Sequence, residues 1–332
     1  MSPISAAAPA PAPEPVTTDP FHSAERRVAL LALLSALRDD GYSFVTATPA
    51  THARVVARPD RQEGRSLRDA LGWSLPFRAD AIPPHILDLM RQAGVVQERP
   101  GDRLASTVRV SSVWGRLFLH SAYPTDAEDS VFLGPDSYRF ADLIVARRGL
   151  PASGARILDY AAGAGVGGIT AAGDQDGARL TLADINPKAL FLAGINAEHA
   201  GLDAQTVEAR APGDLAGPFD LIVTHPPFMI DEDKRFYRDG GDLWGARLSL
   251  DWVLAGAEKL APGGQLILHT GVSIVEGRDV LLEHLREALP DLGCTLWYHE
   301  LDPDIFGDEM SKPVYAQVER IAAVGAVVTR DG

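Results

Sequence analysis

The chain has 332 residues, enough for one sizeable domain and a smaller one, and its apolar content of 46% is ordinary for a globular protein. Its formal net charge of -14 argues against a large nucleic acid-binding surface. We find neither a membrane-spanning apolar run nor a signal peptide, and therefore expect a cytoplasmic protein without membrane partners. The single cysteine, Cys294, is predicted to be a buried structural thiol, and no metal site is expected.

The first part of the chain predicts a tail and a small domain. Residues 1–20 alternate Ala and Pro, which favours an extended, solvated segment. Residues 21–125 are expected to form an α+β domain with helices over 24–39, 65–72 and 85–93 and a hairpin of strands over 104–110 and 113–119. We interpret this domain as a cap on the main domain rather than a winged-helix module, because no basic recognition helix stands out.

Residues 126–332 predict the main domain. Strands and helices alternate, which is typical of an α/β fold with a mostly parallel sheet covered on both faces. A turn over 134–137 precedes a first helix. The expected strands cover 157–160, 179–183, 206–209, 219–223, 265–269, 295–300 and 320–328, and further helices cover 187–199, 248–260 and 279–288. Ligands bind such sheets at the carboxyl ends of the strands.

A glycine-rich loop follows the first of these strands. After Asp159 the sequence Gly163-Ala164-Gly165-Val166-Gly167-Gly168 matches G-x-G-x-x-G. Glycine allows positive φ and a close approach of ligand to backbone, and the following helix directs its free N–H groups at that ligand. Asp184 ends the next strand, where a carboxylate can bind ribose hydroxyls. These features indicate an adenosine-type cofactor without separating NAD from S-adenosylmethionine.

The segment Asp220 to Phe228, D-L-I-V-T-H-P-P-F, distinguishes between the two cofactors. Two prolines directly after a buried strand form a rigid loop without N–H groups, which NAD enzymes do not need. Over residues 129–328 the sequence resembles the class I S-adenosylmethionine-dependent methyltransferases of the small-domain type, the group of the release-factor glutamine and adenine-N6 methyltransferases. The resemblance rests on I-L-D-Y-A-A-G-A-G, on L-A-D-I-N-P-K-A-L, on F-D-L-I-V-T-H-P-P-F in place of the family's Asn-Pro-Pro-Tyr/Phe, and on G-P-D-S-Y-R-F upstream.

The resemblance implies a Rossmann-like class I methyltransferase sheet with S-adenosylmethionine as its cofactor. The cofactor-binding residues that it implies are Asp159, Ala161, Gly163, Gly165, Asp184, Ile185 and Thr224. Ala161 replaces the family's first glycine, which is tolerable if its φ stays negative. Glu208 and Asp214 are weak candidates for contacting the adenine amino group.

His225, Pro226 and Phe228 are implied to hold the methyl acceptor. His225 stands where the family has an Asn that holds the amino group being methylated. A ring nitrogen can accept an N–H or act as a base, so an amine, imidazole, hydroxyl or thioether acceptor stays open, and a purely structural His225 is the alternative.

Residues 229–249 are expected to form a substrate lid. Arg235, Tyr237 and Arg238 of this segment, with Tyr138 upstream, are candidate substrate-binding residues; simple solvated loop charges are the alternative. The acidic run over 299–309 is interpreted as a solvated connection rather than a metal site.

The function predicted from the sequence is therefore methyl transfer from S-adenosylmethionine to a nitrogen of a protein side chain or small molecule. The alternatives are a small-metabolite S- or O-methyltransferase, a cofactor-binding protein without turnover, and an NAD oxidoreductase. Nucleic acid is the least favoured substrate. The sequence leaves open whether the protein is a monomer or a homodimer.

Overall fold

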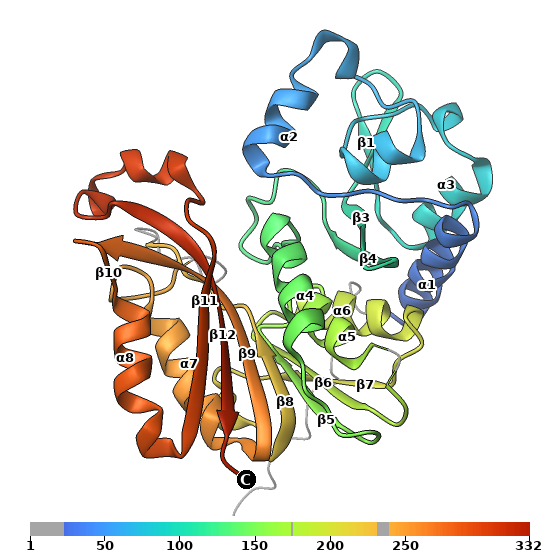
Figure 1. The fold of residues 1–332 in the computed structure, drawn as a ribbon. Helices are drawn as coiled ribbons and strands as arrows, with labels where there is room; N and C mark the ends of the chain where they lie inside the picture. The colour runs from blue at the N-terminus through green and yellow to red at the C-terminus, as the bar shows by residue number, and fades with distance from the viewer. Residues whose placement is uncertain (1–22, 174, 231–238) are drawn as a thin grey trace, which may run out of the picture.

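The computed structural model describes residues 23–173, 175–230 and 239–332 (Figure 1), so the expected tail lies outside the described residues. The helices are α1 (Ala24–Asp39), α2 (Pro49–Val56), α3 (Pro84–Gln92), α4 (Pro135–Arg147), α5 (Val166–Ala172), α6 (Pro187–His199), α7 (Arg247–Glu258) and α8 (Val280–Ala288). The strands are β1 (Val96–Arg99), β2 (Arg103–Ser106), β3 (Val108–Val113), β4 (Arg116–Ser121), β5 (Arg156–Tyr160), β6 (Arg179–Asp184), β7 (Ala204–Glu208), β8 (Phe219–Thr224), β9 (Leu260–Val275), β10 (Arg278–Asp279), β11 (Cys294–Asp302) and β12 (Arg320–Arg330).

The main sheet has eight strands in the order β11-β12-β9-β8-β5-β6-β7, with β10 paired to β9. Strands β7, β6, β5, β8 and β9 run parallel, and β12 and β11 close one edge in antiparallel orientation. From β5 the chain adds β6 and β7 on one side, and it then returns to add β8 on the other side of β5. The boundary between β5 and β8 is therefore the switch point of a doubly wound fold. The expected Rossmann-like α/β sheet with a closing antiparallel pair is confirmed.

The two faces of this sheet are buried by different helices. Ile157 and Leu158 are adjacent in β5 and fully buried, and they belong to different core clusters because side chains alternate across a strand. Helices α4, α5 and α6 cover one face, and α7 and α8 cover the other (Figure 1). Cys294, at the start of β11, is buried as predicted.

The N-terminal part contains α1 to α3 and two separate hairpins, β1–β2 and β3–β4. The prediction of one hairpin turn between residues 110 and 113 is wrong. Trp114 and Gly115 have positive φ and form the turn, while residues 103–106 pair with the unexpected strand β1. The helix expected over 65–72 is reduced to a π-helical turn, Arg68–Gly72.

Helix α2 was also missed. Its signal is present in the sequence, because Thr48 caps the helix and Pro49 occupies the first helical position. None of the helices in the described residues is long and apolar enough to cross a membrane. Within the same residues, no three His, Cys, Asp or Glu side chains gather to form a candidate metal site.

One buried side chain connects the N-terminal part to the glycine-rich loop. Asn196 of α6 accepts the Leu119 N–H at 2.8 Å and donates to the Leu119 carbonyl at 3.0 Å, so it pairs with β4 like a neighbouring strand. Its amide also donates to the Ala164 carbonyl at 2.9 Å. The hydrophobic core is continuous across this contact, and the N-terminal part therefore packs against the end of the sheet where ligands bind.

Candidate cofactor and acceptor site

The carboxyl ends of β5, β6 and β8 bring the predicted site residues to one edge of the sheet. Tyr160 at the end of β5 pairs with Thr224 at the end of β8, and Asp184 ends β6 on the other side. The glycine-rich loop leaves this edge after Tyr160, and the His-Pro-Pro-Phe segment leaves it after Thr224. The two motifs that carry the predicted chemistry are therefore neighbours in space.

The glycine-rich loop adopts a conformation that requires glycine. Gly163 has φ +53 and Gly165 has φ +80, and Gly165 is the N-cap of α5. A Cβ added to Gly163 would meet no atom within 4 Å, so open space lies in front of this backbone. Ala161, however, has φ +60, so the condition stated for an alanine at this position, a negative φ, is not met. This left-handed conformation is unfavourable for a residue with a Cβ, so the backbone at Ala161 is strained.

Two aspartates accept hydrogen bonds from backbone N–H groups of this loop and of the helix that follows it. Asp159 is 1% exposed, and its carboxylate accepts the Gly168 N–H at 2.6 Å. Burial raises its pKa to about 7, which the Gly168 hydrogen bond opposes. Asp184 accepts the N–H of Gly163 at 2.8 Å and of Asn186 at 2.9 Å, and burial raises its pKa as well. Each carboxylate oxygen can accept more than one hydrogen bond, so these contacts do not use the full accepting capacity of either group.

His225 is held by a residue that the sequence analysis did not select. Its Nδ1 lies 2.8 Å from the backbone oxygen of His269 in β9 and 3.3 Å from the His269 Nδ1. If Nδ1 carried no proton, its lone pair would point at a lone pair of the carbonyl oxygen, and the two would repel each other. The geometry therefore assigns the proton to Nδ1. Burial lowers the pKa of His225, although the Asp136 charge opposes the shift. The neutral ring therefore keeps Nε2 as a hydrogen-bond acceptor.

Aromatic rings surround His225. The ring centroids of Phe140 and Phe228 lie 5.7 and 5.8 Å from that of His225, and Phe306 packs edge-on against Phe228 at 5.6 Å. Phe228 needs Gly271 beneath it, because a Cβ there would lie 2.3 Å from its ring. These aromatic rings make the surroundings of His225 apolar and offer flat faces, which suits a planar or apolar acceptor group.

A buried acidic group lies near this ring. Asp136 of α4 is 5% exposed and pairs with Arg139 at 3.0 Å, and Arg139 also reaches Asp302 at 2.8 Å. Asp136 lies in the G-P-D-S-Y-R-F motif that carried the resemblance. Its negative charge raises the pKa of His225 against the effect of burial. His269 could have been found as the polar residue that ends an apolar strand, but the sequence has no signal that pairs it with His225.

The remaining predicted residues are distributed differently. Thr224 donates its hydroxyl to the Tyr160 carbonyl at 2.8 Å and so links the ends of β8 and β5. The hydroxyl of Tyr138 accepts the Thr46 N–H at 2.9 Å, which turns this residue toward the N-terminal part. Ile185 is 38% exposed just after β6.

The two candidates for the adenine amino group are both exposed. Glu208 ends β7 beside Asp184, whereas the carboxylate of Asp214 accepts the Ala211 N–H within its own loop. The substrate candidates Arg235, Tyr237 and Arg238 lie outside the described residues, so their role stays a prediction.

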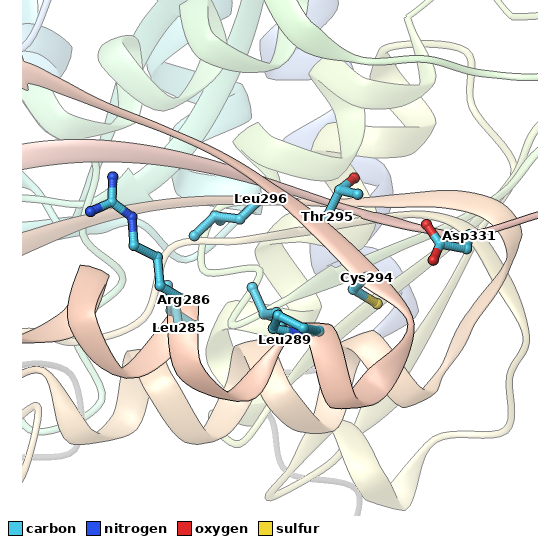
Figure 2. A pocket seen from close by; sticks show the side chains of 8 residues that line it. Leu285, Arg286, Leu289, Cys294, Thr295, Leu296 and Asp331 are labelled. Atoms are coloured by element: carbon cyan, nitrogen blue, oxygen red, sulfur yellow. The ribbon is translucent and has the colours of Figure 1, made fainter.

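A further pocket lies away from the site around His225. Figure 2 shows a pocket of about 440 Å³ between α8 and the start of β11, lined by Leu285, Leu289, Cys294 and Asp331. Cys294 pairs with Arg330, and Thr329 pairs with Gln265 at the beginning of the parallel part of β9. This pocket therefore lies at the amino-terminal edge of the sheet, opposite the edge where a doubly wound fold binds its ligand.

The open loop, the two carboxylates and the proline-rich strand end fit the methionine and ribose ends of S-adenosylmethionine. Together with the strand order, they are the features expected of a class I methyltransferase domain. Comparison with known proteins agrees: residues 143–273 match the family model described as "Methyltransferase small domain". The prediction of a small-domain class I methyltransferase domain, with S-adenosylmethionine as its cofactor, is confirmed.

Curated relatives point in the same direction. The chain is 34% identical to the release factor glutamine methyltransferase of Deinococcus radiodurans over 46% of this chain and 55% of that protein. It is 36% identical to the ribosomal RNA small subunit methyltransferase C of Pseudoalteromonas atlantica over 22% and 21%, and 30% identical to the ribosomal protein uL3 glutamine methyltransferase of Bradyrhizobium diazoefficiens over 46% and 50%. The chain thus spans about half, or less, of the curated relatives it matches. Because one of them is named as an RNA methyltransferase, the argument against nucleic acid from net charge is not supported.

Proposed function

We propose that this protein transfers a methyl group from S-adenosylmethionine to a nitrogen atom of a protein side chain or of a small molecule. The observation that carries the proposal is the placement of His225, whose Nδ1 lies 2.8 Å from the His269 carbonyl oxygen, so that Nε2 is left as an acceptor. In this role His225 replaces the acceptor oxygen of the asparagine found in the resembling family. The glutamine methyltransferases among the relatives support a nitrogen acceptor.

S-adenosylmethionine, when bound, supplies an electrophilic methyl group on a sulfonium. Gly163, Gly165 and Asp159 would hold its methionine end, and Asp184 its ribose. The Nε2 of His225 would accept an N–H of the substrate and orient the nitrogen lone pair toward the methyl carbon. The nitrogen would lose a proton when it is methylated, and the Nε2 of His225 would be placed to take it. Phe228 and Phe140 would exclude water and position a flat acceptor group.

Methylation of a sulfur or oxygen in a small metabolite is the second candidate, because a histidine can also act as the base for a hydroxyl or thiol. Location in the cytoplasm stays a prediction.

The test combines binding with transfer. Thermal unfolding with S-adenosylmethionine or NAD is expected to show stabilisation by the former alone. Incubation of the protein with cell extract and deuterated-methyl cofactor, followed by mass spectrometry, is expected to identify an N-methylated product. Stabilisation by NAD alone would overturn the proposal, and cofactor binding without any labelled product would favour a non-catalytic role. A product labelled on sulfur or oxygen would establish the second candidate.

A further inference from the structure

A second group of buried polar side chains lies in the N-terminal part, outside the site around His225. Arg109 of β3 pairs directly with His120 of β4, so the two side chains share one face of the hairpin. Arg109 is 4% exposed, His120 is 1% exposed, and His52 of α2, also 1% exposed, lies with them. Three basic side chains are thus buried together.

Arg109 carries a positive charge without a carboxylate partner. Its Nε donates to the Gly72 carbonyl at 2.9 Å, a second nitrogen reaches the Thr46 hydroxyl at 3.4 Å, and the guanidinium lies 5.6 Å from the centre of the Phe44 ring. Among the residues that the structure describes, no Asp or Glu forms an ion pair with it. Burial lowers the pKa of Arg109 to about 10. A buried charge without an opposite charge is costly, so this position favours an anion.

The histidines add unused hydrogen-bonding groups. Neither ring nitrogen of His52 forms a well-aligned hydrogen bond, although both are buried, and the same holds for the Nδ1 of His120. The nearest polar groups are the backbone of Trp73 for His52 and of Ser121 for His120, and each raises the pKa of its histidine against the effect of burial. The other nitrogen of His120 contacts the Ser111 hydroxyl at 2.8 Å. Burial and the Arg109 charge lower the pKa of His52 to about 4, so at neutral pH its ring is uncharged and has one N–H to donate. Buried polar groups without partners are rare and call for a ligand or an ordered water.

These side chains line one narrow pocket. Arg109, His52 and His120 border it with Thr46, Tyr123 and Phe132, around about 10 Å³ of free space, which is the size of one water-sized group. The ring of His52 is held 4.0 Å from that of Tyr123 and 5.2 Å from that of Trp73. Phe132 at the border is 42% exposed, so an exposed apolar side chain forms the rim.

We propose that this pocket binds the carboxylate group of a ligand. One guanidinium and neutral histidines give the site a single positive charge, which matches a monoanion better than a phosphate dianion. A planar guanidinium also pairs geometrically with a planar carboxylate, and the free space of about 10 Å³ admits one oxygen of that group beside the guanidinium. The His52 N–H supplies a further donor, and Phe132 faces the apolar remainder of the ligand.

The carboxylate can arrive on a free small acid or on the methyl acceptor. A carboxylate on the methyl acceptor rests on the proposed function. It is supported by the short segment of chain that connects this pocket to the surroundings of His225. Phe132 and Leu133 border the pocket, and Asp136, whose charge acts on His225, follows three positions after Leu133. Tyr138 of the same helix binds Thr46 of the pocket.

The test measures binding without methyl transfer. Thermal unfolding of the full chain is followed in sodium acetate, sodium phosphate and sodium chloride at equal ionic strength. Acetate is expected to raise the melting temperature of the wild type above the value in the other two salts. Arg109→Met should abolish this response, and His52→Phe should weaken acetate binding at least tenfold. Arg68→Met, which removes an exposed arginine beside the same Phe44 ring, should respond like the wild type.

An equal response to all three salts, or an undiminished acetate response in Arg109→Met, would overturn the proposal. If Arg109→Met does not fold, the proposal is tested with His52→Phe, because this variant keeps the arginine and the ring contacts with Tyr123 and Trp73. Wild-type acetate binding in His52→Phe would also overturn the proposal. Adding acetate to the transfer reaction separates the two sources of the carboxylate. Competition with the acceptor indicates a carboxylate on the acceptor, and acetate binding without competition indicates a free acid.

Discussion

The Nδ1 of His225, which directly follows β8, lies 2.8 Å from the backbone oxygen of His269 in the neighbouring parallel strand β9. This contact determines both the orientation of the His225 ring and the nitrogen that carries its proton. It leaves Nε2 as the atom that can receive an N–H of the acceptor.

His225→Ala is expected to lower methyl transfer about 100-fold or more, because it removes the group that orients the acceptor. His225→Asn restores an acceptor oxygen and should recover part of this loss. Initial rates of label transfer from deuterated-methyl cofactor measure both variants. His284→Ala is the control, since its Nδ1 only contacts the Val280 carbonyl of its own helix. Full activity in both His225 variants would contradict the proposed acceptor site.

Gly271→Ala should impair transfer without impairing cofactor binding. The added Cβ would lie 2.3 Å from the Phe228 ring, so Phe228 must leave its place beside His225. Cofactor affinity from calorimetry and transfer rates from labelling are compared with those of Gly213→Ala, where a Cβ meets no atom within 4 Å. Unchanged transfer in Gly271→Ala would show that the position of Phe228 does not matter.

Asp159→Asn is expected to stabilise the protein at pH 8 and not at pH 4. The pKa of Asp159 is raised from 3.8 to about 7, so above pH 7 the native state carries a buried charge that the unfolded chain hydrates better. The difference corresponds to at most about 4 kcal/mol and disappears as the pH falls from 7 to 4, where the carboxyl is protonated in the native state. Urea unfolding at several pH values measures it.

Asp220→Asn should change the stability at pH 8 in the opposite direction to Asp159→Asn. A hydrogen bond from Arg156 lowers the pKa of Asp220, so its charge stabilises the native state, and the asparagine variant should lose stability at pH 8. The same sign in both variants would contradict the assignment of Asp159 as a buried, destabilising carboxylate.

Ala161→Gly should raise the free energy of unfolding by about 0.5–1 kcal/mol. The left-handed conformation of Ala161, φ +60, costs a residue with a Cβ about 1–2 kcal/mol, and the greater freedom of glycine in the unfolded chain offsets part of the gain. Ala162→Gly, at a neighbouring position without positive φ, should instead destabilise the protein. Equal destabilisation by both substitutions in urea unfolding would contradict the strain at Ala161.

Asn196→Ala should lower the free energy of unfolding by about 2–4 kcal/mol, because it leaves the buried N–H and carbonyl of Leu119 and the carbonyl of Ala164 without a partner. It should also weaken cofactor binding, since the Ala164 contact supports the glycine-rich loop. Ser23→Ala, which removes only the N-cap of α1, should cost about 1 kcal/mol and leave cofactor binding intact. Stability loss in Asn196→Ala without any change in cofactor affinity would show that the loop does not depend on this contact.

Local sequence signals were sufficient for the main sheet. Alternating apolar strands, capped helices and strand-end aspartates predicted β5 to β9 and the site edge, because these features depend on residues close together in the chain. The N-terminal part was predicted less well. Its strands are short. Only the pairing of β3 with β4 distinguishes the actual turn at Trp114 and Gly115 from the turn predicted between residues 110 and 113.

The sequence by itself determined the class of this protein, since the glycine-rich loop, Asp184 and the His-Pro-Pro-Phe segment are contiguous motifs whose chemistry can be read without coordinates. The tertiary structure alone decided what surrounds His225 and what surrounds Arg109. His269 lies 44 positions from His225, and Arg109 is buried by Thr46 and Gly72 from other parts of the chain. Protonation states and unpaired charges depend on burial, and burial is a property of the packed chain rather than of any segment.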